Sequence, residues 1–98
     1  MAQFDVHRLA DGGLVVECQA NRFDYIGTRL VIPLMPADYT PPRNDRLNPR
    51  VAVNDEQLYV VTQLAQAIRT SELRGRVGSI ASDRDAIVRA LDVLIGAG

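Results

Sequence analysis

The segment Arg29-Leu30-Val31-Ile32-Pro33-Leu34-Met35 is the most apolar strand that the sequence predicts. Its apolar side chains alternate, with Leu30, Ile32 and Leu34 on one face and Val31 and Met35 on the other. This pattern is typical of a strand that is covered on both sides. Pro33 has no backbone N–H, so it must lie at a sheet edge, at a bulge or on the non-bonded side of the strand. We therefore expect a strand that bends or forms part of a small closed barrel, and a sheet that is not flat.

The residues before this strand predict a hairpin. Two alternating segments, residues 3–9 and 14–19, flank Ala10-Asp11-Gly12-Gly13, whose residues tolerate a positive φ. His7 falls on the face opposite to Phe4, and we expect it to be an exposed strand residue.

Residues 36–50 form the one long irregular segment that the sequence predicts. The segment contains four prolines together with Arg43, Arg46 and Arg50. Its prolines exclude a helix or a central strand. Loops of this length often carry binding function, so the segment is either a binding loop or a solvated connector.

The chain beyond this loop predicts more β structure. Residues 51–53 and 57–62 flank Asn54-Asp55-Glu56 and predict a second hairpin. Residues 64–76 give a mixed pattern, for which we expect irregular chain with short strands.

An amphipathic helix is predicted from about Ser82, with Ser82 as its N-cap and acidic residues in its first turn. Its apolar side chains cover roughly 200° of the helix, about twice the width of an ordinary apolar stripe. The helix therefore lies between the sheet and a neighbouring loop, or between the sheet and a second subunit. We expect a homodimer with Val88, Leu91 and Ile95 at its interface, because a small domain gains most from association.

The composition excludes several classes of function. The formal net charge is -1, and all eleven basic residues are arginines. This balance gives no support to general nucleic-acid or membrane-surface binding. Cys18 and His7 are the single residues of their kinds. That count excludes an intrachain disulfide and a cysteine- or histidine-based metal centre, and Cys18 is interpreted as a small core residue.

The length and the absence of export or membrane signals set further expectations. We expect a single domain over residues 1–98. A chain with no signal peptide and no long apolar run is expected to be a soluble cytoplasmic protein, and we expect no cofactor and no metal.

Four segments together resemble the CcdB family of toxins. They are Ala2-Gln3-Phe4-Asp5-Val6, the run Arg29-Leu30-Val31-Ile32-Pro33-Leu34, the turn Asn54-Asp55-Glu56 followed by Thr62, and the terminal helix. The resemblance covers nearly the whole chain in order. It implies a mainly β fold with one C-terminal α-helix, a small SH3-like β-barrel of the CcdB/MazF type, assembled as a homodimer.

The resemblance also implies a function. Toxins of this family belong to plasmid or chromosomal toxin–antitoxin pairs, bind the A subunit of DNA gyrase and trap the enzyme on cleaved DNA, without being enzymes themselves. In the family the last three residues, tryptophan, glycine and isoleucine, carry the toxicity. Gly96, Ala97 and Gly98 occupy these places here, and the chain contains no tryptophan. Leu94 and Ile95 are then the apolar anchor for the target.

A CcdA-type antitoxin is the second implied partner. Family antitoxins are disordered, acidic in their C-terminal part, and fold along the toxin. Arg43, Arg46 and Arg50 offer forked donors for carboxylates and are the predicted antitoxin contacts.

Other classes of function stay open. The chain is alternatively a diverged family member that has lost toxicity or acts on another target, or a structural or interaction module. A MazF-like endoribonuclease shares the barrel, so fold alone does not separate it from a gyrase poison. RNA cleavage needs an acid–base pair and phosphate-binding cations, for which His7, Arg29 and Thr62 are the candidates, although no spacing links them.

Overall fold

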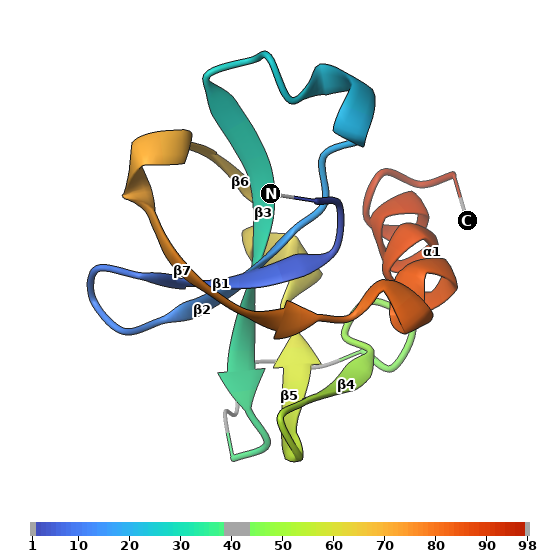
Figure 1. The fold of residues 1–98 in the computed structure, drawn as a ribbon. Helices are drawn as coiled ribbons and strands as arrows, with labels where there is room; N and C mark the ends of the chain where they lie inside the picture. The colour runs from blue at the N-terminus through green and yellow to red at the C-terminus, as the bar shows by residue number, and fades with distance from the viewer. Residues whose placement is uncertain (1, 39–43, 98) are drawn as a thin grey trace.

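The computed structural model describes residues 2–38 and 44–97 of the 98-residue chain. Within these ranges the chain forms seven β-strands and one α-helix, which confirms the predicted mainly β fold with a C-terminal helix (Figure 1). The strands are β1 (Asp5–Leu9), β2 (Leu14–Glu17), β3 (Thr28–Pro36), β4 (Arg50–Val53), β5 (Glu56–Val60), β6 (Gln66–Arg69) and β7 (Leu73–Ser79). Short 3-10 segments are η1 (Asn21–Phe23), η2 (Thr62–Leu64), η3 (Thr70–Glu72) and η4 (Ala81–Asp83), and the helix is α1 (Arg84–Leu94).

Strand β3 lies at the centre of the sheet. The strand order is β4-β5-β3-β2-β1-β7, with β6 paired to β3 outside this path. One edge of β3 pairs with β2, and the other pairs first with β6 and then with β5. Pro33 lies where that second edge changes partner, and its carbonyl accepts the Val61 N–H at 3.0 Å. The Pro33 nitrogen, which has no N–H, therefore faces the point where β3 changes its partner from β6 to β5, and not β2. This is the non-bonded side of the strand, one of the predicted positions. The sheet curls strongly in Figure 1.

Both faces of β3 are covered, which confirms the interpretation of its alternating pattern. The main core contains Phe4, Val6, Val16, Cys18, Ile32, Leu34, Val51, Val53, Leu58, Val60, Ile80 and Ile87. On the opposite face Val31 packs with Val15 and Ile68 in a smaller cluster. The strand is thus apolar on both sides because each side faces packed side chains.

Cys18 belongs to the main core, as predicted. Burial, together with the neighbouring carboxylate of Glu17, raises the pKa of its thiol to about 12. The side chain is therefore a protonated, packed thiol at neutral pH, with little nucleophilic character.

The two predicted hairpins are both present. β1 pairs with β2 around a turn in which Gly12 has a φ of 89°, and β4 pairs with β5 around Asn54 and Asp55, whose φ angles are 51° and 68°. Two successive positive φ angles define a type I′ turn, which suits Asn and Asp. Residues 64–76 contain the short strand β6, as predicted, and the start of β7, which is longer than predicted because β1 offers it a pairing edge.

The helix begins later than predicted. α1 starts at Arg84, after η4, so Ser82 is not its N-cap, and that prediction is wrong. The cause is the tight turn before it, where the Asp83 N–H donates to the Ile80 carbonyl at 2.9 Å. The helix buries Ile87 and Ala90, whereas much of its wide apolar arc stays partly exposed. Among the described residues no helix is long and apolar enough to cross a membrane.

Candidate functional site

The C-terminal end of α1 exposes large apolar side chains. Leu94 is 43% exposed and Ile95 is 75% exposed. The Gly96 N–H donates to the Val93 carbonyl at 3.1 Å and the Ala97 N–H to the Asp92 carbonyl at 2.7 Å, and Gly96 has a φ of 80°. These bonds form a Schellman motif, which ends a helix at its C-terminal glycine. The predicted anchor therefore sits on a closed helix end.

The structure places the predicted target-binding and dimer residues in different environments. Gly96 and Ala97 fold back into the helix cap, and Gly98 lies outside the described residues. Val88 and Leu91 are half-buried against the chain's own core, while Ile95 is exposed. Their part in a second subunit stays a prediction.

The loop between β2 and β3 exposes a second set of apolar side chains, which the sequence analysis missed. Tyr25 is 78% exposed, Ile26 is 40% exposed and Phe23 is 37% exposed. An available signal was the presence of three large apolar residues within a polar, glycine-containing connection that has no alternating pattern. Exposed apolar side chains of this size in one short loop make the loop a candidate contact surface.

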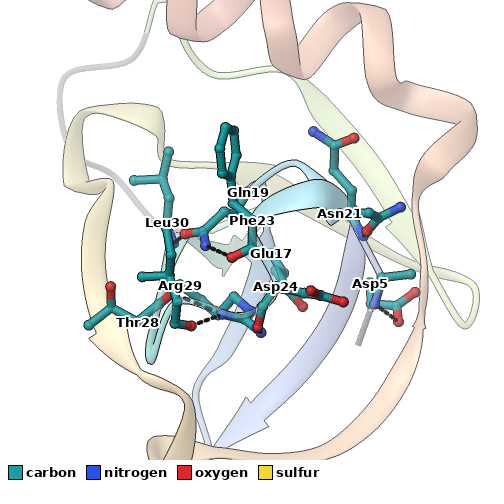
Figure 2. Close-up of polar contacts among 12 residues, drawn as sticks. Asp5, Glu17, Gln19, Asn21, Phe23, Asp24, Thr28, Arg29 and Leu30 are labelled. Atoms are coloured by element: carbon teal, nitrogen blue, oxygen red, sulfur yellow. Dashed lines mark hydrogen bonds and ion pairs between the residues drawn. The ribbon is translucent and has the colours of Figure 1, made fainter.

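Beneath this loop lies a buried arginine that captures its backbone carbonyls (Figure 2). Arg29, on β3, is 3% exposed. Its Nη2 donates to the Asp24 carbonyl at 2.6 Å, and its Nη1 donates to the carbonyls of Thr28, at 3.0 Å, and Ile26. The guanidinium thus satisfies carbonyls that have no strand partner.

Glu17 supplies the countercharge for this arginine. Glu17 Oε1 lies 2.9 Å from Arg29 Nε, and both side chains are 4% exposed. Glu17 Oε2 lies 3.8 Å from His7 Nε2. Within the described residues, neither of these last two atoms has a hydrogen-bond partner.

His7 is buried, and the prediction of an exposed strand residue is wrong. The cause is β7, which pairs with β1 and covers this face of the hairpin. His7 Nδ1 lies 3.1 Å from the Arg74 carbonyl, so Nδ1 carries a proton and donates to that oxygen.

Two further side chains fix the loop. Gln19 Nε2 donates to the Phe23 carbonyl at 2.9 Å, while Gln19 Oε1 accepts the Leu30 N–H at 3.1 Å. The Gln3 N–H donates to Asn21 Oδ1 at 2.8 Å, which ties the N-terminal segment to η1. Figure 2 shows these groups around the loop. The loop is therefore held by Arg29 of β3 and by Gln19 and Asn21, which belong to the connection itself.

Asp5, on β1, forms an ion pair with Arg76 on β7. Burial alone would raise the pKa of its carboxyl, but the Ala2 N–H at 3.0 Å and Arg76 at 3.2 Å outweigh burial and hold the pKa below its usual value. Asp5 is therefore a stable carboxylate near neutral pH, and it ties β1 to β7.

Two of the three arginines predicted to contact an antitoxin, Arg46 and Arg50, lie before and at the start of β4. Arg43 lies outside the described residues, and Arg46 is exposed. Arg50 begins β4, with its guanidinium 5.6 Å from the centre of the Tyr59 ring and Nη2 donating to the Tyr59 hydroxyl at 3.3 Å. Buried Asn48 fixes the backbone between them by donating to the Val60 carbonyl at 3.1 Å and to Gln63 at 2.6 Å.

The three ribonuclease candidates do not form an accessible site. His7 and Arg29 meet at Glu17, but both are buried, and the guanidinium of Arg29 is occupied by loop carbonyls. Thr62 is fully buried at the start of η2. Over residues 2–38 and 44–97, no three His, Cys, Asp or Glu side chains gather where they could hold a metal.

Comparison with known families gives one match. The family model described as CcdB, the CcdB protein, matches residues 3–97, nearly the whole chain. The sequence has no match among curated proteins.

Comparison with solved structures shows the shared fold. A mycobacterial endoribonuclease in complex with its cognate antitoxin superimposes with a TM-score of 0.80 and 17% identity, over 100% of this chain and 97% of that one. The Mycobacterium tuberculosis toxin MazF-mt6 gives a TM-score of 0.77 and 17% identity, covering 96% of this chain and 98% of that one. A further mycobacterial endoribonuclease gives 0.76 and 18% identity, over 98% and 91% of the two chains. These likenesses confirm the predicted CcdB/MazF-like fold.

Proposed function

The chain belongs to the CcdB family, since the family model covers residues 3–97, and from this premise we propose that it is a toxin that binds the A subunit of DNA gyrase and traps the gyrase–DNA cleavage complex. Family membership itself supports the toxin of a toxin–antitoxin pair. Gyrase as the target is the finer part of the proposal.

The observation that carries the target proposal is the exposed apolar end of α1. Leu94 and Ile95 project from a helix that Gly96 closes. An apolar anchor on a rigid element is the kind of group that dominates a protein–protein contact. The chain has no tryptophan, and among residues 2–38 and 44–97 the exposed aromatic side chains are those of Phe23 and Tyr25.

The proposed assembly is a homodimer that uses the rest of the apolar arc. Val88 and Leu91 are only half-buried by the chain's own core, and Ile95 is exposed. A second copy would cover Val88, Leu91 and the side of Ile95 that faces them, and would leave Leu94 and the rest of the helix end for a dimeric target. Sedimentation at micromolar concentration tests this assembly, and a strict monomer would contradict it.

A CcdA-type antitoxin is the proposed inhibitor. Arg46 is exposed, and Arg50 is held against Tyr59 with its charge available to solvent. Forked guanidinium donors suit an acidic, disordered segment that folds on binding. Replacing Arg43, Arg46 and Arg50 with alanine should weaken antitoxin binding and reduce its salt dependence.

The proposed toxin acts by binding and not by catalysis. Burial of His7, Arg29 and Thr62 supports this, because none of them reaches solvent to contact RNA. The structural likeness to endoribonucleases favours RNA cleavage as the second candidate. A family member that has lost toxicity is the third.

Expression in a gyrase-bearing host tests the proposal. The full chain should arrest growth and accumulate cleaved gyrase–DNA complexes. The double substitution Leu94→Ser and Ile95→Ser should relieve both effects, whereas Gln57→Ser, at an exposed position on β5, should not. Deleting residues 96–98 removes the helix cap and should also reduce toxicity. RNA cleavage without gyrase trapping would favour the ribonuclease, and unaffected growth would favour a non-toxic relative.

A further inference from the structure

The loop between β2 and β3 combines an ordered backbone with exposed side chains. Its carbonyls at residues 23, 24, 26 and 28 accept hydrogen bonds from Gln19 and Arg29, and the Gly27 carbonyl accepts the Thr70 N–H at 3.1 Å. Meanwhile Tyr25 is 78% exposed, Phe23 and Ile26 are 37% and 40% exposed, and none of the three belongs to either core cluster. The order of this loop therefore does not come from packing its own side chains.

A buried ion pair is a costly way to order a surface loop. Charged groups lose their hydration on burial, and apolar residues of similar size often stabilise a fold as well. Glu17 and Arg29 are both nearly inaccessible to water. Their distinctive contribution is geometric, because the guanidinium reaches the Asp24 carbonyl with one branch and those of Ile26 and Thr28 with the other.

We propose that Arg29, Glu17 and Gln19 are positioning residues that hold the β2–β3 loop in the shape in which Phe23 and Tyr25 contact the toxin's target. This inference rests on the proposed function. Arg29 and Gln19 grip the loop carbonyls, and Glu17 orients Arg29. A preformed loop loses less conformational freedom on binding, which strengthens the affinity.

Arg29→Lys tests the hydrogen bonds of the guanidinium separately from its charge. Lysine keeps a positive charge beside Glu17, but its single ammonium group cannot reproduce the fork. Arg8→Lys is the matched control, since Arg8 is exposed on the β1–β2 hairpin and donates to the Gly12 carbonyl.

Gln19→Glu is a milder second variant. The carboxylate can still accept the Leu30 N–H, but it cannot donate to the Phe23 carbonyl. Gln57→Glu makes the same change at an exposed site near the β4–β5 turn and is its control.

Hydrogen exchange on the full chain measures the order of the loop backbone directly. The reporters are the Ile26 N–H, which donates to the Phe23 carbonyl, and the Thr70 N–H, which donates to the Gly27 carbonyl. Arg29→Lys should accelerate their exchange by about tenfold or more relative to the Gly12 N–H, a reference outside the loop. Unchanged exchange at both reporters would overturn the inference.

Binding to the purified gyrase A subunit then tests the functional part. Arg29→Lys should weaken binding by about tenfold, and Gln19→Glu should weaken it by a smaller factor. Both controls should bind with the affinity of the wild type. A purely structural role would leave the affinity unchanged once the variant is folded, so faster exchange with unchanged affinity overturns the inference. If the wild type itself does not bind, the gyrase proposal fails. The loop then serves another target if Arg29→Lys arrests growth less than the wild type does. Equal growth arrest by the two chains would overturn the inference.

Discussion

The β4–β5 and β2–β3 connections order their backbones in different ways. The first is a tight turn in which Asn54 and Asp55 adopt positive φ angles and the flanking strands pair up to the turn. The second is longer, and its carbonyls depend on Arg29 and Gln19. A local rule therefore determines the first connection, while the second depends on the buried Arg29 of β3 and on the half-buried Gln19. The second also exposes the aromatic side chains of Phe23 and Tyr25 to solvent.

The largest expected effect comes from removing the countercharge of the second connection. Glu17→Ala leaves Arg29 buried without its carboxylate and should lower the free energy of unfolding by about 3–5 kcal/mol. Urea titration followed by circular dichroism measures this loss. Replacing Glu17 and Arg29 together with methionine should cost far less, because no charge is left unpaired. Equal losses in the two variants would show that the ion pair itself stabilises the fold.

The tight turn should respond to a change in φ preference. Asn54→Val places a β-branched residue at a φ of 51° and removes the 3.4 Å hydrogen bond to the Val77 carbonyl. The free energy of unfolding should fall by about 1–3 kcal/mol. Gln57→Val, at an exposed position on the adjoining strand β5, is the control and should be tolerated. A neutral Asn54→Val would mean that the strands and not the turn determine the hairpin.

Two glycines separate the need for a positive φ from the need for space around the Cα atom. Gly96 has a φ of 80°, whereas Gly27, in the β2–β3 loop, has no positive φ, and a Cβ at either position meets nothing within 4 Å. Gly96→Ala should cost about 1–2 kcal/mol and fray the end of α1. Gly27→Ala should be neutral or slightly stabilising. Thermal unfolding and the hydrogen exchange of Ala97 compare them, and equal effects would contradict the proposed helix cap.

The smallest effect concerns pH. Folding lowers the pKa of Asp5 from its usual value of 3.8, so its carboxylate contributes stability above that pH and loses it as pH falls through the lower folded pKa. Asp5→Asn should therefore remove part of the acid sensitivity below about pH 4. Unfolding midpoints measured at pH 6 and pH 3 test this, and an unchanged difference between wild type and variant would exclude Asp5 as a source of acid sensitivity.

The sequence predicted the local parts of the structure well and the long-range parts poorly. Alternation in β3 and the Asn54-Asp55-Glu56 turn carry their own signals, because strands have a period of two and such turns need positive φ. His7 could not be placed, because its burial depends on β7, far along the chain. The sequence predicts Arg29 as a strand residue and as a candidate RNA-binding cation, and nothing in its neighbours indicates that it binds the carbonyls of a loop.

The same division holds for the candidate site. The resemblance to the CcdB family predicts Leu94 and Ile95 as the target anchor, and both side chains are exposed at the helix end. Their binding role stays a prediction. The aromatic loop was missed because an irregular connection gives no periodic pattern that separates outward from inward side chains.

The most direct test of gyrase poisoning is a cleavage assay with purified bacterial gyrase, supercoiled DNA and the folded chain. If the chain is a gyrase poison, linear DNA should accumulate after denaturation of the trapped complex, and the Leu94→Ser, Ile95→Ser variant should reduce it by about tenfold or more, as expected for the loss of a central apolar anchor. No linear DNA above the gyrase-only background, at concentrations where the chain is folded, would contradict this account.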